Sequence, residues 1–176
     1  MDFSKLNELE VEELIVEANF DNNITLLKVI FLEKKIADIN KITDFDKWNY
    51  LHRVLCYFTP SLDLIKFYID NGVNINAQDV YGMTPLHYAL RSKNVEAAIA
   101  LLEAGADPNL PNRDGLIPLS MIGYIPDRLD VLELMLQKGA NVHYLVNDDE
   151  TILESYKPTD REPELKPIYD LMKKYS

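Results

Sequence analysis

The chain has 176 residues, of which 47% are hydrophobic and 27% are charged, and its formal net charge is −11. This length fits one domain, and the apolar fraction is sufficient for a hydrophobic core. Acidic residues outnumber basic ones by 29 to 18, which argues against nucleic-acid binding and against docking on an anionic membrane. A protein partner with a basic surface suits this charge better.

Cysteine content and the N-terminal sequence indicate in which cellular compartment the protein is expected. Cys56 is the only cysteine, so an intrachain disulfide and a cysteine-rich metal site are excluded. The first ten residues are acidic and lack the basic and apolar regions of a signal peptide. The most apolar stretch, 26–32, contains Lys28 and is far shorter than the ~20 residues of a membrane span. We expect a reduced, cytoplasmic protein without a membrane segment.

The N-terminal segment predicts two amphipathic helices. Apolar residues recur at helical spacing first at Val11, Leu14, Ile15 and Ala18 and again over 24–31.

A second helix pair is predicted in the middle of the chain. Thr84 suits a helix N-cap and Pro85 the first helical position. The segment 91–94 then forms a turn, and a second apolar face over 95–102 ends at Gly105, a residue suited to the left-handed conformation that closes helices. An extended segment and a turn follow, so the unit is a helix–turn–helix with a β-turn finger.

This unit recurs along the chain. The sequence GMTPLH at 82–87 matches GLIPLS at 115–120, an offset of 33 residues. The segments GVNIN at 72–76, GADPN at 105–109 and GANVH at 139–143 follow at offsets of 33 and 34. Weaker copies occur at 36–40 and 149–153. Regular offsets of this length are typical of solenoid proteins.

The block 79–111, with TPLH at 84–87 and GADPN at 105–109, resembles an ankyrin repeat. The resemblance is strong over residues 44–153 and weaker outside them. It implies an all-α ankyrin-repeat solenoid of about five stacked helix–turn–helix units with β-turn fingers, forming one domain over 1–176. The expected units are an N-terminal capping repeat at 1–43, central repeats at 44–78, 79–111 and 112–145, and a C-terminal capping repeat at 146–176.

Several units depart from the ankyrin pattern. Repeat four has Ile117 in place of the capping Thr and Ser120 in place of the His, and repeat two has Asn49 at the capping position. Repeat five lacks its glycine and carries a polar insertion at 157–163 before a last helix at about 165–174. Irregular polar units at both ends suit a solenoid, whose end repeats have no covering neighbour.

Neither catalysis nor metal or cofactor binding is expected. The chain lacks the histidine and cysteine spacings of zinc sites and the glycine-rich motifs of phosphate sites. His52 and Cys56, four residues apart, leave a hydrolytic or thiol enzyme as a remote alternative. The resemblance instead implies structural roles, including backbone bridging by the two motif histidines, for Thr84, Pro85, His87, His52, Gly105, Gly72 and Gly139.

Ankyrin-like proteins bind partners on a concave face made of finger tips and first helices, and the resemblance carries these positions onto this chain. Trp48 is expected to be the main anchor, because large rigid aromatic side chains dominate binding hot spots. Phe45 and Tyr57 could equally fold inward as packing, and the finger carboxylates, Asp79 among them, would form an acidic rim. The expected partner-binding residues are Phe45, Asp46, Trp48, Tyr57, Tyr81, Met83, Arg91, Arg113, Asp114, Leu116, Tyr124, Asp148 and Glu150.

The resulting hypothesis is a non-catalytic protein–protein interaction module, monomeric when free, that binds and inhibits a basic partner. A small acidic ankyrin-like protein resembles bacterial immunity proteins, so a toxin or effector is the expected partner. A scaffold or adaptor that recruits a partner without inhibiting it is the alternative, because both roles use the same face.

Overall fold

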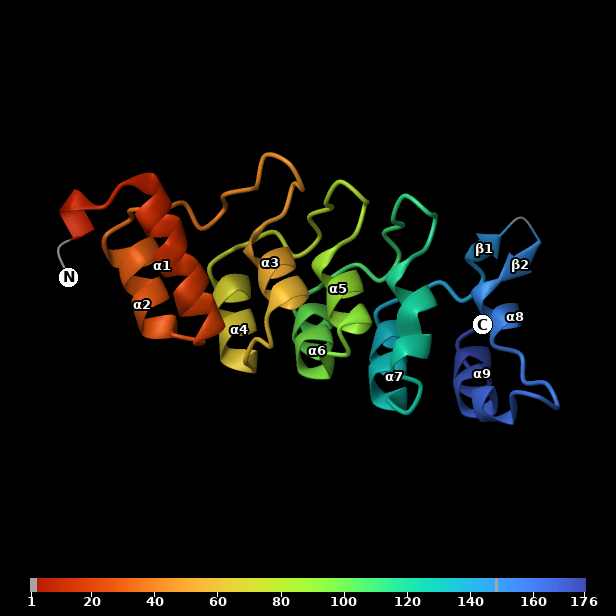
Figure 1. Cartoon of the computed structure of the whole chain (residues 1–176). Coiled ribbons are helices and arrows are strands. Elements are labelled where there is room, and N and C mark those ends of the chain that lie inside the picture. Colours follow the sequence, from red (N-terminus) through yellow and green to blue (C-terminus); the bar gives the residue numbers. More distant parts are fainter. Residues whose placement is uncertain (1–2, 148) are drawn as a thin grey trace.

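The computed structural model describes residues 3–147 and 149–176. Its helix pairs stand side by side in a single row, and a loop rises from the same edge of the row before each of the central pairs (Figure 1). We call these loops fingers two, three and four, at 43–48, 78–83 and 111–116. This arrangement is the all-α solenoid that the repeats predicted.

Repeat one contains the two helices expected near the N-terminus. A 3-10 turn, Phe3–Lys5, precedes α1 (Glu8–Phe20), which begins with a capping box between Asn7 and Glu10. The second helix, α2 (Ile24–Lys28), continues as a π-helix, Val29–Glu33.

Repeats two and three have the same construction. Repeat two contains α3 (Tyr50–Tyr57) and α4 (Leu62–Asp70), and repeat three contains α5 (Pro85–Arg91) and α6 (Val95–Glu103). The side chains of Asn49 and Thr84 accept hydrogen bonds from backbone amides at the starts of α3 and α5. Both N-caps stand at the positions that the sequence indicated.

Repeat four differs in its first helix. The segment Pro118–Tyr124 is a 3-10 helix, and it is followed by α7 (Leu129–Gln137). Ile117, at the N-cap position, has no side-chain oxygen to satisfy the first amides of a helix, and the hydroxyl of Ser120 is buried without a hydrogen-bond partner among the described residues. The departures read from the sequence therefore coincide with a change of helix type.

The C-terminal unit contains the strands of the structure. Strand β1 (Leu145–Asn147) pairs antiparallel with β2 (Glu150–Thr151), so the finger of this unit is a short hairpin. It leads into α8 (Ile152–Ser155), a 3-10 turn, Pro163–Leu165, and α9 (Lys166–Lys173). The last helix confirms the one expected at about 165–174.

A repeated turn follows the second helix of each of the first four units. A side-chain oxygen accepts the backbone N–H two residues later at Asp38, Asn74, Asp107 and Asn141. Gly105 precedes one of these turns with a φ of +94°, a conformation that glycine adopts without steric cost. The turn lets the chain leave each helix pair in the same direction.

One continuous core runs through the row. Helix α5 packs against α3, α6 and the 3-10 helix of repeat four, so each unit is covered by its neighbours. Within the described part of the chain, no helix combines the length and apolar character needed to cross a bilayer.

Candidate interaction surface

Two buried histidines join repeats two and three to the finger of the repeat that follows. The ring of His87 accepts hydrogen bonds from the backbone N–H and hydroxyl of Thr84 at Nδ1, at 3.1 and 2.8 Å, and donates from Nε2 to the carbonyl of Leu116 at 3.0 Å. His52 likewise lies 3.0 Å from the carbonyl of Met83 through Nε2. The structural role implied for both histidines agrees with these contacts.

Burial keeps both rings neutral. Desolvation lowers the pKa of His87 to about 4, against the smaller opposing effect of its bond to the Leu116 carbonyl. Desolvation also lowers the pKa of His52. For His87, a neutral ring that accepts at Nδ1 and donates at Nε2 is the form that its contacts require.

Backbone hydrogen bonds hold neighbouring fingers together. The amide of Val80 donates to the carbonyl of Asp46 at 3.0 Å, and the amide of Arg113 donates to the carbonyl of Tyr81 at 2.8 Å. A Cβ atom at Gly82 would lie only 3.0 Å from backbone atoms of finger four. Fingers two, three and four therefore form a row with fixed spacing.

The expectation that Trp48 faces solvent is wrong. Its side chain is only 7% exposed, and its indole N–H donates to Asp79 Oδ2 at 3.0 Å. The indole ring also lies edge-on to Tyr88, 5.8 Å between centroids, and 5.2 Å from Tyr57. The sole tryptophan is thus a packing residue between repeats two and three.

Asp79 is also buried, so it does not belong to the acidic rim expected from the sequence. Its carboxylate accepts hydrogen bonds from Tyr88, from Trp48 and from the amides of Tyr81 and Met83. Desolvation raises the pKa of this carboxyl, but the hydrogen bonds together outweigh it and leave the pKa below its usual value. Asp79 is an ionised structural residue.

Met83 and Leu116 repeat the behaviour of Trp48. Each of the three residues directly precedes an N-cap position, and Met83 is 4% exposed while Leu116 is half-buried. The expectation that Met83 faces solvent is therefore wrong, and the same expectation for Leu116 is only partly correct. The position turns inward because the next finger covers it: Met83 Sδ lies 3.4 Å from Asn112 Nδ2.

Four of the aromatic residues expected to bind a partner do face solvent. Phe45 is 85% exposed, Tyr57 69%, Tyr81 59% and Tyr124 48%. Phe45 and Tyr81 stand on fingers two and three, and Tyr57 and Tyr124 end the first helices of repeats two and four. We call these four residues the finger surface. Their exposure decides the open question of whether Phe45 and Tyr57 fold inward.

Charged residues accompany the finger surface. Asp46 and Asp114 occupy the places on fingers two and four that Tyr81 occupies on finger three, and both are at least partly exposed. Arg91 is exposed with its guanidinium 4.6 Å from the Tyr88 ring, and Arg113 is exposed on finger four. Glu150 is half-buried in β2, while Asp148 lies outside the described residues.

The structure does not bring Cys56 and His52 together as a thiol–imidazole pair. Cys56 is exposed, but the His52 ring four residues away is fully buried, with hydrogen bonds at both nitrogens. The backbone amide of exposed His143 donates within its turn. In the part of the chain that the structure describes, no group of histidine, cysteine and acidic side chains could hold a metal ion.

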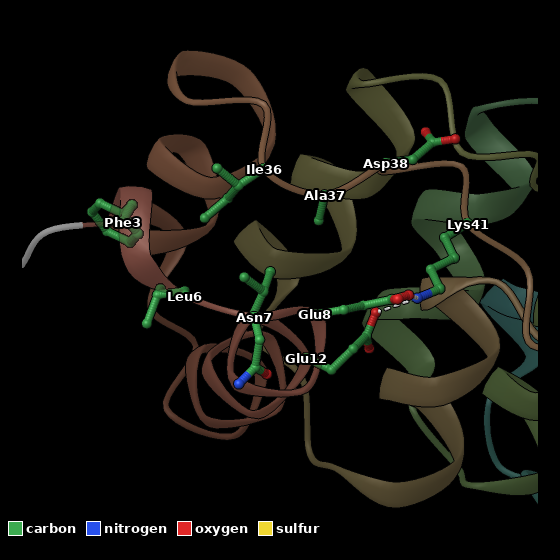
Figure 2. Close-up of a pocket in the computed structure, with 10 residues that line it drawn as sticks. Phe3, Leu6, Asn7, Glu8, Glu12, Ile36, Ala37, Asp38 and Lys41 are labelled. Carbon is green, nitrogen blue, oxygen red and sulfur yellow. Dashed lines mark hydrogen bonds and ion pairs between the residues drawn. The ribbon is translucent and has the colours of Figure 1, made fainter.

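A hollow also opens in the N-terminal repeat, between the start of α1 and the segment 36–41 (Figure 2). Phe3, Leu6 and Ile36 line its apolar side. At the other side Lys41 Nζ binds Glu8 at 2.9 Å and Glu12 at 3.0 Å. Lys41 pairs with both glutamates at once, and its pKa rises because of these two hydrogen bonds.

Sequence reasoning missed one exposed surface. Leu9, Val16 and Phe20 lie on the solvent side of α1, although the sequence indicated only the buried face around Val11 and Ile15. The signal was available, because these three residues form a second apolar line at helical spacing in the same helix.

The family model for ankyrin repeats in three copies matches residues 14–112 and 60–148. Among curated relatives, an ankyrin repeat protein of Rickettsia bellii (strain RML369-C) is 28% identical over 145 residues, covering 82% of this chain and 77% of the relative. A second protein of that strain is 38% identical over 82 residues, 44% of this chain and 23% of the relative.

An ankyrin repeat protein of fowlpox virus (strain NVSL) is 32% identical over 104 residues, 58% of this chain and 14% of the relative. This chain thus spans less than a quarter of that relative and of the second Rickettsia protein. The family model covers most of the chain and agrees with the stacked helix pairs and histidine bridges. The chain therefore belongs to the ankyrin-repeat family, whose repeats form protein–protein interaction modules.

Proposed function

We propose that this protein uses its finger surface to bind a partner protein with a basic surface, and that the complex blocks the partner's active surface. The observation that carries this proposal is the position of Tyr81. Its ring is 59% exposed, and the neighbouring fingers carry Asp46 and Asp114 at the equivalent places. An aromatic face between two carboxylates suits a lysine or arginine side chain of a partner.

The rigidity of the finger row supports the same proposal. The bonds from Val80 to Asp46 and from Arg113 to Tyr81 fix the spacing of the fingers before a partner arrives. Little conformational entropy is then lost on binding, so more of the contact energy remains as affinity. Exposed tyrosines also lose few rotatable bonds when they are covered.

The net charge of −11 adds a long-range contribution. Complementary charge raises the association rate of a basic partner and rejects acidic proteins. A toxin or effector that acts on nucleic acid would present such a basic surface. We therefore propose, more specifically, that the protein is an immunity protein that acts in the cytoplasm. The proposed free form is a monomer.

A scaffold or adaptor role is the second candidate, supported by the same exposed rings. The two roles differ in one property: an inhibitor abolishes the activity of the captured partner, whereas an adaptor leaves it unchanged. An activity assay of the purified complex separates them.

Affinity capture from the native host, followed by mass spectrometry, tests the proposal. The bait is the whole chain, compared with the Tyr57→Ala/Tyr81→Ala double variant. Tyr175→Ala is the matched control, because Tyr175 is 42% exposed near the C-terminus. We expect a basic protein to be retained by the wild type and the control, with affinity for the double variant weakened by roughly 2 kcal/mol or more. Equal retention by all three baits would contradict the proposal.

A further inference from the structure

Three large apolar side chains form a line on the solvent side of α1. Leu9 is 68% exposed, Val16 39% and Phe20 71%. Spacings of seven and four residues place them on one face of the helix, opposite the buried Val11 and Ile15. We call Leu9, Val16 and Phe20 the α1 stripe. Large apolar side chains gathered on the exposed face of a charged helix are typical of an interaction site.

The stripe has the spacing of a helix–helix seam. Leu9, Glu13, Val16 and Phe20 follow one another at intervals of four, three and four residues, as the d and a positions of consecutive heptads do. Three of these four seam positions are apolar, and the remaining one carries the carboxylate of Glu13. A second helix that covers the stripe must therefore bring a cation to Glu13.

The carboxylates beside the stripe differ from those on the other side of α1. Glu8 and Glu12 bind Lys41 (Figure 2). Glu12 also binds Arg53 at 3.2 Å. The exposed side chains of Glu13 and Glu17 form no ion pair or hydrogen bond with any described residue. The helix thus has one neutralised side and one side whose negative charge is available to a partner.

The helix that carries the stripe is held at both ends. Asn7 and Glu10 cap its start reciprocally, at 3.0 and 2.8 Å. Near its end, the ring of Phe20 lies edge-on to Phe58 of repeat two, 6.2 Å between centroids. A partner helix therefore meets a preformed surface, which reduces the entropy lost on docking.

We propose that the α1 stripe binds a basic amphipathic helix of a partner protein, with apolar residues facing Leu9, Val16 and Phe20 and a lysine or arginine facing Glu13. A second copy of this chain fits poorly, because pairing two α1 helices would bring their glutamates together. The inference goes beyond the proposed function, since it uses α1 and not the finger surface.

A synthetic peptide tests the inference with the full chain. The probe is a helical peptide of about 20 residues, roughly 30 Å long, with leucines at a and d positions, one lysine in the seam and lysines at e and g. The control peptide has the same composition, but its leucines are distributed around the helix and form no apolar face. Fluorescence anisotropy gives the affinity, and amide chemical shifts of the labelled protein locate the site.

We expect saturable binding of the first peptide only, with shifts concentrated in 8–20. Val16→Lys and, independently, Leu9→Ser should weaken binding about tenfold or more. Leu32→Lys is the matched control, because Leu32 is also 39% exposed but lies in the π-helix. Glu13→Gln should weaken binding and its salt dependence, whereas Glu33→Gln should not.

Equal binding of both peptides, or no effect of Val16→Lys in a folded protein, would overturn the inference. The inference would also be overturned if sedimentation showed that the free chain is a dimer and that Val16→Lys dissociates this dimer. The double variant Tyr57→Ala/Tyr81→Ala should bind the peptide normally, so failure here and failure of the finger-surface proposal give different results.

Discussion

The junction between fingers two and three and the junction between fingers three and four have the same backbone geometry and different chemistry. In the first junction the Asp79 carboxylate accepts hydrogen bonds from Trp48, from Tyr88 and from two amides. In the second, Asn112 Oδ1 accepts hydrogen bonds from two backbone amides in the same way, but its Nδ2 donates to Met83 Sδ, at 3.4 Å, and to no other described residue.

The first helix that follows each junction shows the same difference, with more polar contacts at the first junction than at the second. Thr84 caps α5 and His87 bridges to finger four, whereas Ile117 and Ser120 at the equivalent positions leave a 3-10 helix with a buried, unpaired hydroxyl among the described residues. The ankyrin backbone thus tolerates loss of its polar motif, but we expect the second junction to be less stable.

The largest expected effect is at the tryptophan of the first junction. Trp48→Ala should lower the free energy of unfolding by about 4 kcal/mol, because it leaves a large cavity and removes a donor from a buried carboxylate. Met83→Ala, at the equivalent place in the second junction, should lower it by about 2 kcal/mol. Urea denaturation measures both. Tyr175→Ala, far from both junctions in the sequence and 42% exposed, is the control, and a Trp48→Ala protein as stable as that control would refute the difference between the junctions.

A pH dependence should distinguish the histidine bridge from its serine counterpart. Unfolded His87 gains a proton near pH 6.5, whereas burial lowers its folded pKa to about 4. The unfolded state therefore binds more protons between these values, and stability falls as the pH decreases through this window, by roughly 3 kcal/mol from this group. Unfolding of wild type and His87→Gln at pH 7 and pH 4 measures the contribution. Parallel pH profiles for the two proteins would exclude it.

Asp79→Asn should convert the chemistry of the first junction toward that of the second. The new amide keeps the acceptor for two backbone amides but leaves the Trp48 N–H without its carboxylate, so we expect a loss of about 2 kcal/mol.

The same substitution should remove a stability change at low pH. The folded pKa of Asp79 lies below its unfolded value, so its contribution is present above about pH 4 and is lost as the pH falls through the folded pKa. Urea denaturation of the wild type and Asp79→Asn at pH values from 7 to below 4 measures both the loss of stability and its pH dependence. Asn112→Asp is the reciprocal variant. Unchanged stability of Asp79→Asn at pH 7 would mean that the carboxylate network contributes little.

The smallest expected effect is a gain in repeat four. Ile117→Thr with Ser120→His restores the cap and the bridging ring, and we expect it to stabilise the protein by about 1 kcal/mol. Circular dichroism with urea denaturation, on the double and both single variants, gives the result. A less stable double variant would show that the 3-10 geometry of this segment is set by packing and not by the missing motif.

The fold was largely predictable from the chain alone. The offsets of 33 and 34 residues, the caps at Asn49 and Thr84 and the position of Gly105 depend on local backbone requirements, and each appears where the sequence indicated. The candidate surface was less predictable. Side chains on one finger look equivalent in sequence, but Trp48 and Met83 turn under the next finger while Phe45 and Tyr81 remain exposed.

The sequence by itself determined the repeat, the capping residues and the acidic charge, because these follow from spacing and residue type. Only the tertiary structure decided which finger side chains face solvent, since burial there depends on the neighbouring repeat and not on the repeat that carries the residue. The α1 stripe was decided in the same way: α1 has two apolar faces, and only packing against the rest of the row selects the one that is buried.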